Sequence, residues 1–259
     1  MRTDDNLNWV ECLSWDQVAS RIANGASAIL PVGAGAKEHG FHLPMSTDRI
    51  QAEALAARLS GQIDTLIWPT LSYGYYPAFS NYAGSCSLSA ATFEALIKDI
   101  TTALLGYGRG AVFVLNTGLS TVAPIDRALA RVASEKTCHL KIHDGQRYRN
   151  TATRIAQQEF GSHADELETS LMLALAPDTL DMALAEASPV AGRDASGALT
   201  PIDPSSPNYS ASGSFGDPTL ATRAKGELLL AAMTDDLVEQ ALAFLAGKSV
   251  AVKSSESTS

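Results

Sequence analysis

Short apolar runs alternate with helical periodicity along this chain, and this alternation constrains the fold more than any other feature. Four runs have the length of buried strands: Ser27–Val32, Thr65–Pro69, Ala111–Asn116 and His139–His143. Helical patterns lie between and after them, over Asp48–Leu59, Ser89–Leu105 (with Ser89 as the expected N-cap), Ala123–Glu135, Ala164–Leu175 and Pro218–Ala246. Because strands and helices alternate, we predict a three-layer α/β/α fold, with a mostly parallel sheet covered by helices on both faces.

The composition is typical of one globular domain and argues against several functions. Of the 259 residues, 46% are hydrophobic, so we expect a single α/β domain over residues 1–250, followed by a disordered tail over 251–259. A net charge of −9 argues against a nucleic-acid partner. No run approaches the roughly 20 apolar residues of a membrane span, and the polar N-terminus does not resemble a signal peptide. Three widely spaced cysteines are typical of reduced thiols, so we predict a cytoplasmic protein without a membrane partner.

The segment 29–48, ILPVGAGAKEHGFHLPMSTD, concentrates potential metal ligands directly after a predicted strand. It contains Glu38, His39, His42 and Asp48, and it holds two of the five histidines of the chain. Ligand sites in α/β sheets usually lie where the chain leaves the carboxyl end of a strand. Carboxylate and imidazole groups together suit divalent ions such as Zn, Mn or Fe. The segment therefore indicates one wall of a metal site.

The same loop matches a dinucleotide-binding fingerprint poorly. Gly33 and Gly35 follow a strand, but Glu38 occupies the place of the third glycine of G-x-G-x-x-G. No acidic residue ends a strand about twenty residues further on, where such folds bind the ribose. A metal site is the better interpretation of this loop.

Five segments, in order, resemble the creatininase (creatinine amidohydrolase) family, whose members are metal-dependent hydrolases of amide C–N bonds. Residues 30–48 resemble its LPVG-(x)-E-(x)-HG-x-HLP-(x)-TD signature, and the other matches are PTLSYG (69–74), AGSCSL (83–88), HADELETS (163–170) and GDPTLAT through KGE (216–227). The resemblance extends over about residues 7–245 and implies a creatininase-like fold.

The resemblance implies a binuclear metal centre to which His39 and Asp48 contribute. His39 would bind one metal, and Asp48 would bridge two. Lys37 stands where the family has a glutamate ligand, and Glu38 instead abuts His39 in a loop that is one residue longer. A one-residue bulge would aim Glu38 inward as the replacement metal ligand. The alternative is that Glu38 is solvated and that Lys37 has replaced a ligand.

A second family ligand is missing. The N-G-H segment of the family reads Asn116-Thr117-Gly118 in this chain, so that glycine occupies the histidine position. His143, at the end of the next predicted strand, is the candidate replacement ligand. Alternatively, His143 contacts the substrate or simply ends the strand.

The segment 163–170 resembles HAGE-x-ETS. By this resemblance, His163 is the catalytic residue that holds the reacting carbonyl or moves protons, Glu166 is a ligand of the second metal, and Glu168 orients ligands. Either Glu38 or Glu166 would be the catalytic carboxylate that carries a proton to the leaving nitrogen. In a helix starting here, His163 and Glu166 would share one face. The alternative, a first helical turn whose acids complement the helix dipole, accounts for Asp165 but not for His163. Lys225, in the KGE match, is interpreted as an exposed helix cation.

The predicted function is hydrolysis of an amide or cyclic-amide C–N bond in a small-molecule substrate by metal-activated water, with one or two divalent ions (Zn, Mn or Fe) per chain. Tyr73, in the tyrosine-rich loop 73–88, and His143 are the candidate substrate contacts. The missing family histidine leaves two alternatives open, a single-metal enzyme and a non-catalytic relative that binds a small ligand. Family members assemble as homo-oligomers, often hexamers, so the resemblance implies a homo-oligomer.

Overall fold

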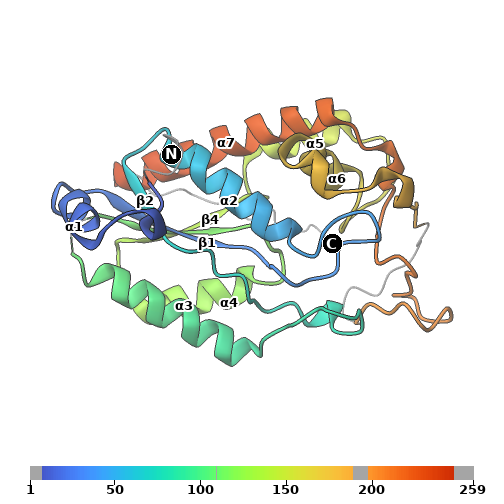
Figure 1. Cartoon of the computed structure of the whole chain (residues 1–259), viewed down its shortest axis with the longest axis horizontal. Coiled ribbons are helices and arrows are strands. Elements are labelled where there is room, and N and C mark those ends of the chain that lie inside the picture. The colour runs from blue at the N-terminus through green and yellow to red at the C-terminus, as the bar shows by residue number, and fades with distance from the viewer. Residues whose placement is uncertain (1–7, 109, 189–197, 248–259) are drawn as a thin grey trace, which may run out of the picture.

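The computed structural model describes residues 8–108, 110–188 and 198–247 of the chain (Figure 1). The α-helices of this part are α1 (Trp15–Ala23), α2 (Thr47–Ser60), α3 (Ala90–Leu105), α4 (Val122–Val132), α5 (Gln146–Ile155), α6 (Glu166–Leu175) and α7 (Arg223–Leu245). The strands are β1 (Ser27–Val32), β2 (Thr65–Ile67), β3 (Val112–Asn116) and β4 (Thr137–Lys141). Short 3₁₀ helices are η2 (Val10–Cys12), η3 (Pro77–Phe79), η4 (Pro177–Thr179), η5 (Met182–Leu184) and η6 (Pro218–Leu220). The predicted tail over 251–259, and the predicted domain end at residue 250, lie outside the described residues.

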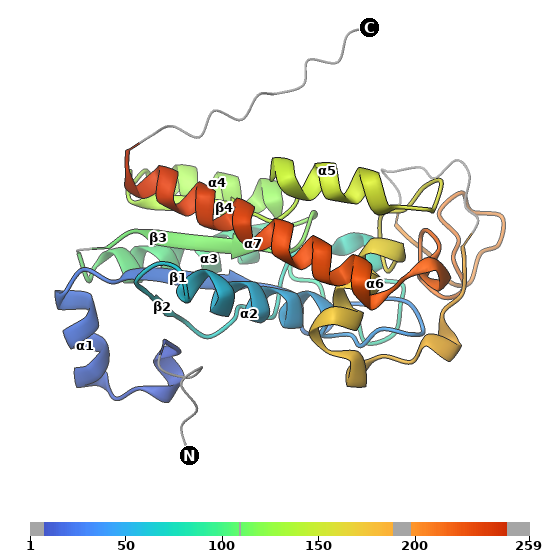
Figure 2. The ribbon, with the colours of Figure 1, turned by 90° about the horizontal axis from the view of Figure 1, so that it is seen from above.

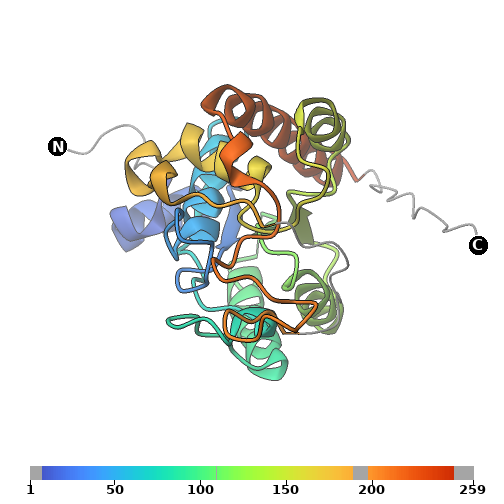
Figure 3. The ribbon, with the colours of Figure 1, turned by 90° about the vertical axis from the view of Figure 1, so that its right-hand side faces the viewer.

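The four strands form one parallel sheet in the order β2-β1-β3-β4. Helices α3 and α4 cover one face, and α2, α5 and α7 cover the other (Figures 1 and 3). Alternate residues of β1 divide between the two cores, with Leu30 in the cluster of Phe93 and Ile29 in the cluster of Leu55. This alternation follows from the two-residue period of a strand, and it confirms the predicted three-layer α/β/α architecture.

The order of the strands creates a crevice at the centre of the sheet. From β1 the chain continues through α2 to β2, whereas β3 lies on the other side of β1. Val32 pairs with Asn116, so β1 and β3 end side by side. Figure 2 shows α6 and the first turns of α7 beyond the ends of these strands. Ligand sites in open α/β sheets lie at such a reversal of strand order.

The element boundaries differ from the sequence prediction in ways that affect the site. The fourth strand, β4, ends at Lys141, two residues before the predicted end, so His143 lies beyond the sheet. Helix α6 begins at Glu166, because the Asp165 side chain caps it by accepting hydrogen bonds from the amides of the second and third helical residues. The predicted helical region from Pro218 is divided into η6 and α7. The prediction omitted α1 and α5.

None of the described helices combines the length and the apolar character needed to span a membrane.

Candidate metal-binding site

Three segments bring polar side chains together at the carboxyl ends of β1 and β3. The loop after β1 contributes Lys37, Glu38 and His39, the first turn of α2 contributes Asp48, and α6 with its preceding turn contributes the remaining members. The start of α2 is fixed to the β3 end, because Thr117 Oγ1 donates a hydrogen bond to the carbonyl oxygen of Asp48 at 3.0 Å. The sheet therefore positions the loop and the helix as one unit.

The His39 ring is fully enclosed and is oriented like a metal ligand. Its Nδ1 lies 2.8 Å from the carbonyl oxygen of Lys37, which can only accept, so Nδ1 carries the hydrogen. Its Nε2 faces Asp48 Oδ1 at 3.1 Å and Glu168 Oε1 at 3.9 Å. A lone pair between two carboxylates requires a positive charge, either a proton on the ring or a metal ion. Metal-binding histidines usually donate their other N–H to a carbonyl or carboxylate, as His39 does.

His163 also faces the Glu168 carboxylate, and Glu38 holds the other side of its ring. Its Nε2 lies 2.8 Å from the carbonyl oxygen of Glu38 and 3.2 Å from Glu38 Oε2. Its Nδ1 lies 3.7 Å from Glu168 Oε2. One ligand atom each from His39, His163 and Glu168 fits within 4.8 Å of the others. Two imidazoles and a carboxylate at this separation form a candidate site for a divalent ion.

Asp48 lies between two positive partners. Its Oδ1 faces His39, and its Oδ2 lies 2.7 Å from the Lys37 ammonium. Both members of this ion pair are buried, and the ammonium also lies 4.9 Å from the centroid of the Phe79 ring. Burial alone would raise the pKa of Asp48, but the charges of Lys37 and His39 hold it well below its usual range. Asp48 is therefore anionic at neutral pH.

Glu38 is buried, and its partner is His163. Its Oε2 faces His163, and its Oε1 accepts a hydrogen bond from the amide of Gly40. Burial raises the pKa of Glu38, but the hydrogen bond and the charge of His163 lower it by more, so the pKa lies below its usual value. Gly213 fits against this carboxylate with φ at +91°, and a Cβ there would lie 1.9 Å from Oε1. The solvated alternative is therefore wrong, and Glu38 points inward against His163, while its predicted role as a metal ligand stays a prediction.

The ligand role predicted for Glu166 requires correction. Its carboxylate is buried against Lys225 Nζ and the amides of Gln157 and Gln158, which use both oxygens. Glu168, predicted only to orient ligands, faces His39 and His163 instead. Residues two apart on a helix point about 200° apart, so only one of the two glutamates can face the site. The predicted helix begins at Ala164, whereas α6 begins two residues later, at Glu166.

Lys225 is likewise not the exposed cation expected from the sequence. Its ammonium contacts the fully buried Glu166 and the carbonyl oxygen of Leu220 at 2.8 Å. This ion pair connects the start of α7 to the start of α6. It therefore supports the turn that presents His163.

The remaining predicted residues lie at the periphery. His42 donates to or accepts from Thr169 Oγ1 at 2.8 Å, and burial lowers its pKa to about 4, so its ring is neutral. His143 Nε2 lies 3.3 Å from the carbonyl oxygen of Thr117, and His143 is not part of the ligand group around His39. Tyr73 is 54% exposed. The structure does not bring either candidate substrate contact into the ligand group.

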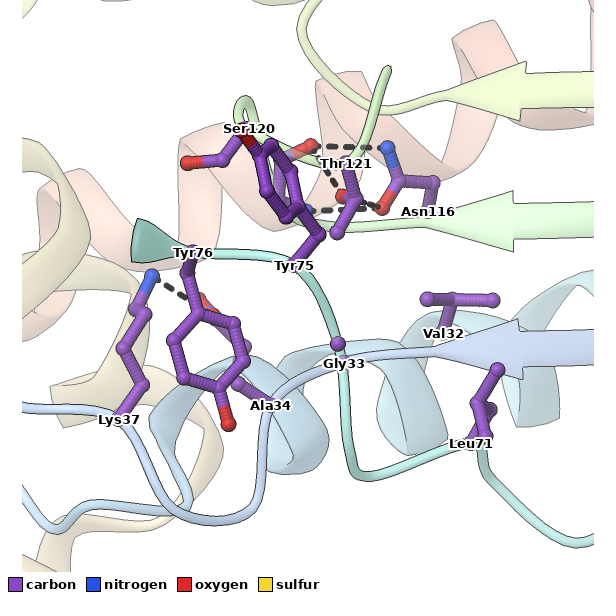
Figure 4. Close-up of a pocket in the computed structure, with 13 residues that line it drawn as sticks. Val32, Gly33, Ala34, Lys37, Leu71, Tyr75, Tyr76, Asn116, Ser120 and Thr121 are labelled. Carbon is purple, nitrogen blue, oxygen red and sulfur yellow. Dashed lines mark hydrogen bonds and ion pairs between the residues drawn. The ribbon is translucent and has the colours of Figure 1, made fainter. Parts of the chain in front are cut away.

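A small cavity of about 20 Å³ adjoins the Lys37–Asp48 pair, at the place where the family histidine is absent. Its lining includes Lys37, Asp48, Tyr75, Tyr76, Gly118 and Ser120 (Figure 4). A Cβ on Gly118 would lie 2.8 Å from Thr121 Oγ1, which is itself fixed by a hydrogen bond to Asn116. The local backbone is therefore adapted to glycine. Tyr75 and Tyr76, rather than the predicted Tyr73, line this space.

Curated relatives of this chain are hydrolases. The family model named creatininase, for creatinine amidohydrolase, matches residues 11–241. A creatinine amidohydrolase of Pseudomonas putida is 30% identical over 237 residues, covering 84% of this chain and 90% of the relative. A mycofactocin precursor peptide peptidase of Mycobacterium ulcerans (strain Agy99) is 28% identical over 240 residues, covering 83% of this chain and 84% of the relative.

Solved creatininase structures share the fold. The structure named "Creatininase Mn" superposes with a TM-score of 0.79 at 26% identity, covering 90% of this chain and 96% of that chain. A creatininase variant named as the Zn-Zn type superposes with a TM-score of 0.78 at 26% identity, covering 89% of this chain and 95% of that chain. The structural relatives are thus named for manganese and for zinc.

Proposed function

Because the chain belongs to the creatininase family, we propose that it is a metal-dependent hydrolase that uses water to cleave an amide or cyclic-amide C–N bond of a small molecule. One observation carries the proposal. The lone pair of His39 Nε2 faces two carboxylates, from Asp48 and Glu168, in a buried site. Buried charges of this kind are costly unless a cation compensates them.

The described donors fit one divalent ion. One ligand atom each from His39, His163 and Glu168 lies within 4.8 Å of the others, and Asp48 Oδ1 lies beside them, 3.1 Å from His39 Nε2. Imidazole and carboxylate ligands suit Zn, Mn or Fe, in agreement with the metals for which the structural relatives are named. The donors do not fit a second ion, because Lys37 occupies the far side of Asp48 and Gly118 offers no side chain.

A bound divalent ion supplies Lewis-acid polarisation of a carbonyl and increases the acidity of water. The chain's own residues would manage the protons. Burial raises the pKa of Glu168, but the charges of His39 and His163 outweigh this and hold it below its usual value, so Glu168 is ionised and accepts a proton. His163, which Glu38 holds through Nε2, directs Nδ1 toward the same carboxylate, and Glu168 would return the proton to the leaving nitrogen.

The small cavity beside Lys37 has room for about one water-sized group, and we propose it as the inner end of the substrate site. It is partly lined by the aromatic rings of Tyr75 and Tyr76 and by the neutral hydroxyl of Ser120. Burial raises the pKa of Tyr76 to about 12, so its hydroxyl stays protonated. The relatives are named for creatinine and for a precursor peptide, so family membership alone does not fix the substrate, and the lining residues would determine it.

The same proposal extends to the state of the protein in the cell. By resemblance to the family we place the enzyme in the cytoplasm as a homo-oligomer, with hexamers as the expected form, and treat residues 1–250 as one domain. Analytical ultracentrifugation measures the oligomeric state, and a monomer at micromolar concentration would contradict this part.

The function is tested by a screen of amides, cyclic amides and short peptides with chelated protein and with protein reloaded with Zn²⁺ or Mn²⁺. We expect turnover only after reloading, and none with Asp48→Ala or Glu168→Gln. Protein that binds metal but cleaves nothing would support the alternative of a non-catalytic ligand-binding relative. Turnover by the chelated wild type would contradict metal dependence.

A further inference from the structure

Asp48 contacts the His39 imidazole and the Lys37 ammonium through separate oxygens, and only the imidazole side can hold a metal ion. Oδ1 faces His39 Nε2 at 3.1 Å, on the side where the Glu168 carboxylate completes the donor set. Oδ2 lies 2.7 Å from Lys37 Nζ. The carboxylate therefore bridges a metal position and an ammonium.

Lys37 is fixed in this place by its surroundings. Its side chain is 9% exposed and that of Asp48 is 5% exposed, so water compensates neither charge. The ammonium also lies over the Phe79 ring at 4.9 Å, a favourable position for a cation. If Lys37 moved away, it would leave the Oδ2 charge buried and unpaired, which proteins rarely tolerate.

The far side of Asp48 offers no ligands for a second ion. Among the described residues that line the adjoining cavity, Asp48 is the one carboxylate, and no imidazole is present. Gly118 stands at the family histidine position, and a Cβ there would press on Thr121 Oγ1 at 2.8 Å. A protonated lysine has no lone pair to donate to a metal, and its charge repels a divalent ion nearby.

We infer that the Lys37 ammonium permanently takes the place of a second metal ion, so that the centre is mononuclear and Lys37 presents a fixed cation to the substrate cavity. This inference rests on the proposed metal site. The ammonium carries three hydrogens, of which Asp48 Oδ2 accepts one. Lys37 also lines the cavity, so the substrate that fits best places a carbonyl or carboxylate oxygen beside it.

The test counts metal ions in the purified, full-length chain. Wild-type protein dialysed against excess Mn²⁺ should hold one equivalent by elemental analysis, with the EPR signal of an isolated Mn²⁺ ion. Lys37→Glu removes the ammonium and adds a carboxylate, and it should hold two equivalents. Lys37→Met is the matched control that removes the charge without adding a ligand, and it should hold one.

The outcomes separate this inference from the proposed function. A wild type that holds two equivalents, or an exchange-coupled Mn pair in its EPR spectrum, would overturn the mononuclear centre while leaving a metal hydrolase intact. One equivalent in the Lys37→Glu variant would also overturn it. A wild type that holds no metal would contradict the proposed function itself. The EPR measurement uses the wild type alone, so it decides the question even if the variants do not fold.

Discussion

Exchanging Glu166 and Glu168 separately for glutamine distinguishes a structural glutamate from a metal ligand. Glu166 is fully buried, and its carboxylate pairs with Lys225 and two backbone amides. Breaking a buried ion pair from one side costs about 3–5 kcal/mol, because the other charge remains uncompensated. For a domain of this size, each kcal/mol lowers Tm by about 2–4 °C, so Glu166→Gln should lower Tm by roughly 6–20 °C.

Glu168→Gln should show the opposite pattern. The Glu168 side chain is 21% exposed and lies close to the Asp48–His39 pair, so its neutralisation should change the stability of the metal-free protein by less than about 1 kcal/mol. The metal affinity should fall at least as far as the 10–100-fold typical of residues that only support ligands. Thermal melts of chelated protein and titration calorimetry with Zn²⁺ measure the two effects. Loss of metal affinity in Glu166→Gln, with full affinity in Glu168→Gln, would refute the reasoning.

Three further predictions concern neighbouring residues. Lys37→Met should destabilise the metal-free protein by about 3–5 kcal/mol in urea melts. Adding Asp48→Asn should recover part of this loss, because the carboxylate that lost its partner is then neutral. Additive losses would show that the two groups are not coupled. Gly213→Ala should lower the free energy of unfolding by more than the roughly 1–3 kcal/mol of a strained backbone, because its Cβ would lie 1.9 Å from Glu38 Oε1. It should also reduce turnover. Gly25→Ala is the matched control, because its φ is +96° and nothing lies within 4 Å of the new Cβ. An equal loss of stability in both variants would show that the contact with Glu38 is not the cause. Finally, the pKa of Glu38 is lower in the folded state than in the unfolded state, where it is about 4.3. Its contribution to stability is therefore fully present above about pH 4.3 and is lost as the pH falls through the folded-state pKa. Below about pH 4, the free energy of unfolding of the wild type should fall more steeply than that of Glu38→Gln.

The sequence predicted the sheet well because strand burial leaves a strong local signal. Ser27–Val32 is fully buried on both faces, and its apolar run identified β1 with the observed boundaries. Helix α5 was missed because its sequence, QRYRNTATRI, is polar and contains no fully buried residue. Its start is instead fixed by Asp236 of α7, whose Oδ2 accepts from the amide of Tyr148 at 2.8 Å. A contact between residues so far apart in the chain is not visible in local periodicity.

The candidate site was predicted in part. His39 and Asp48 lie together as their spacing suggested, and the replacement of a family ligand by Lys37 was visible in the sequence. The choice between Glu166 and Glu168 could not be made from the sequence, because both lie in the helix and its packing, with Glu166 paired to Lys225, decides which side chain faces His39. No sequence pattern signalled that the segment carrying Gly213 would close over Glu38, since that contact forms only in the folded chain.

The most direct test of the account is a crystal structure of protein loaded with Zn²⁺ or Mn²⁺, with anomalous diffraction recorded at the metal edge. The account predicts one anomalous peak per chain, at about 2.0–2.2 Å from a ring nitrogen each of His39 and His163 and from an oxygen of Glu168, with Asp48 beside it and Lys37 still on the far side of Asp48. A chain without a peak, or with a peak bound by Glu166, would contradict it.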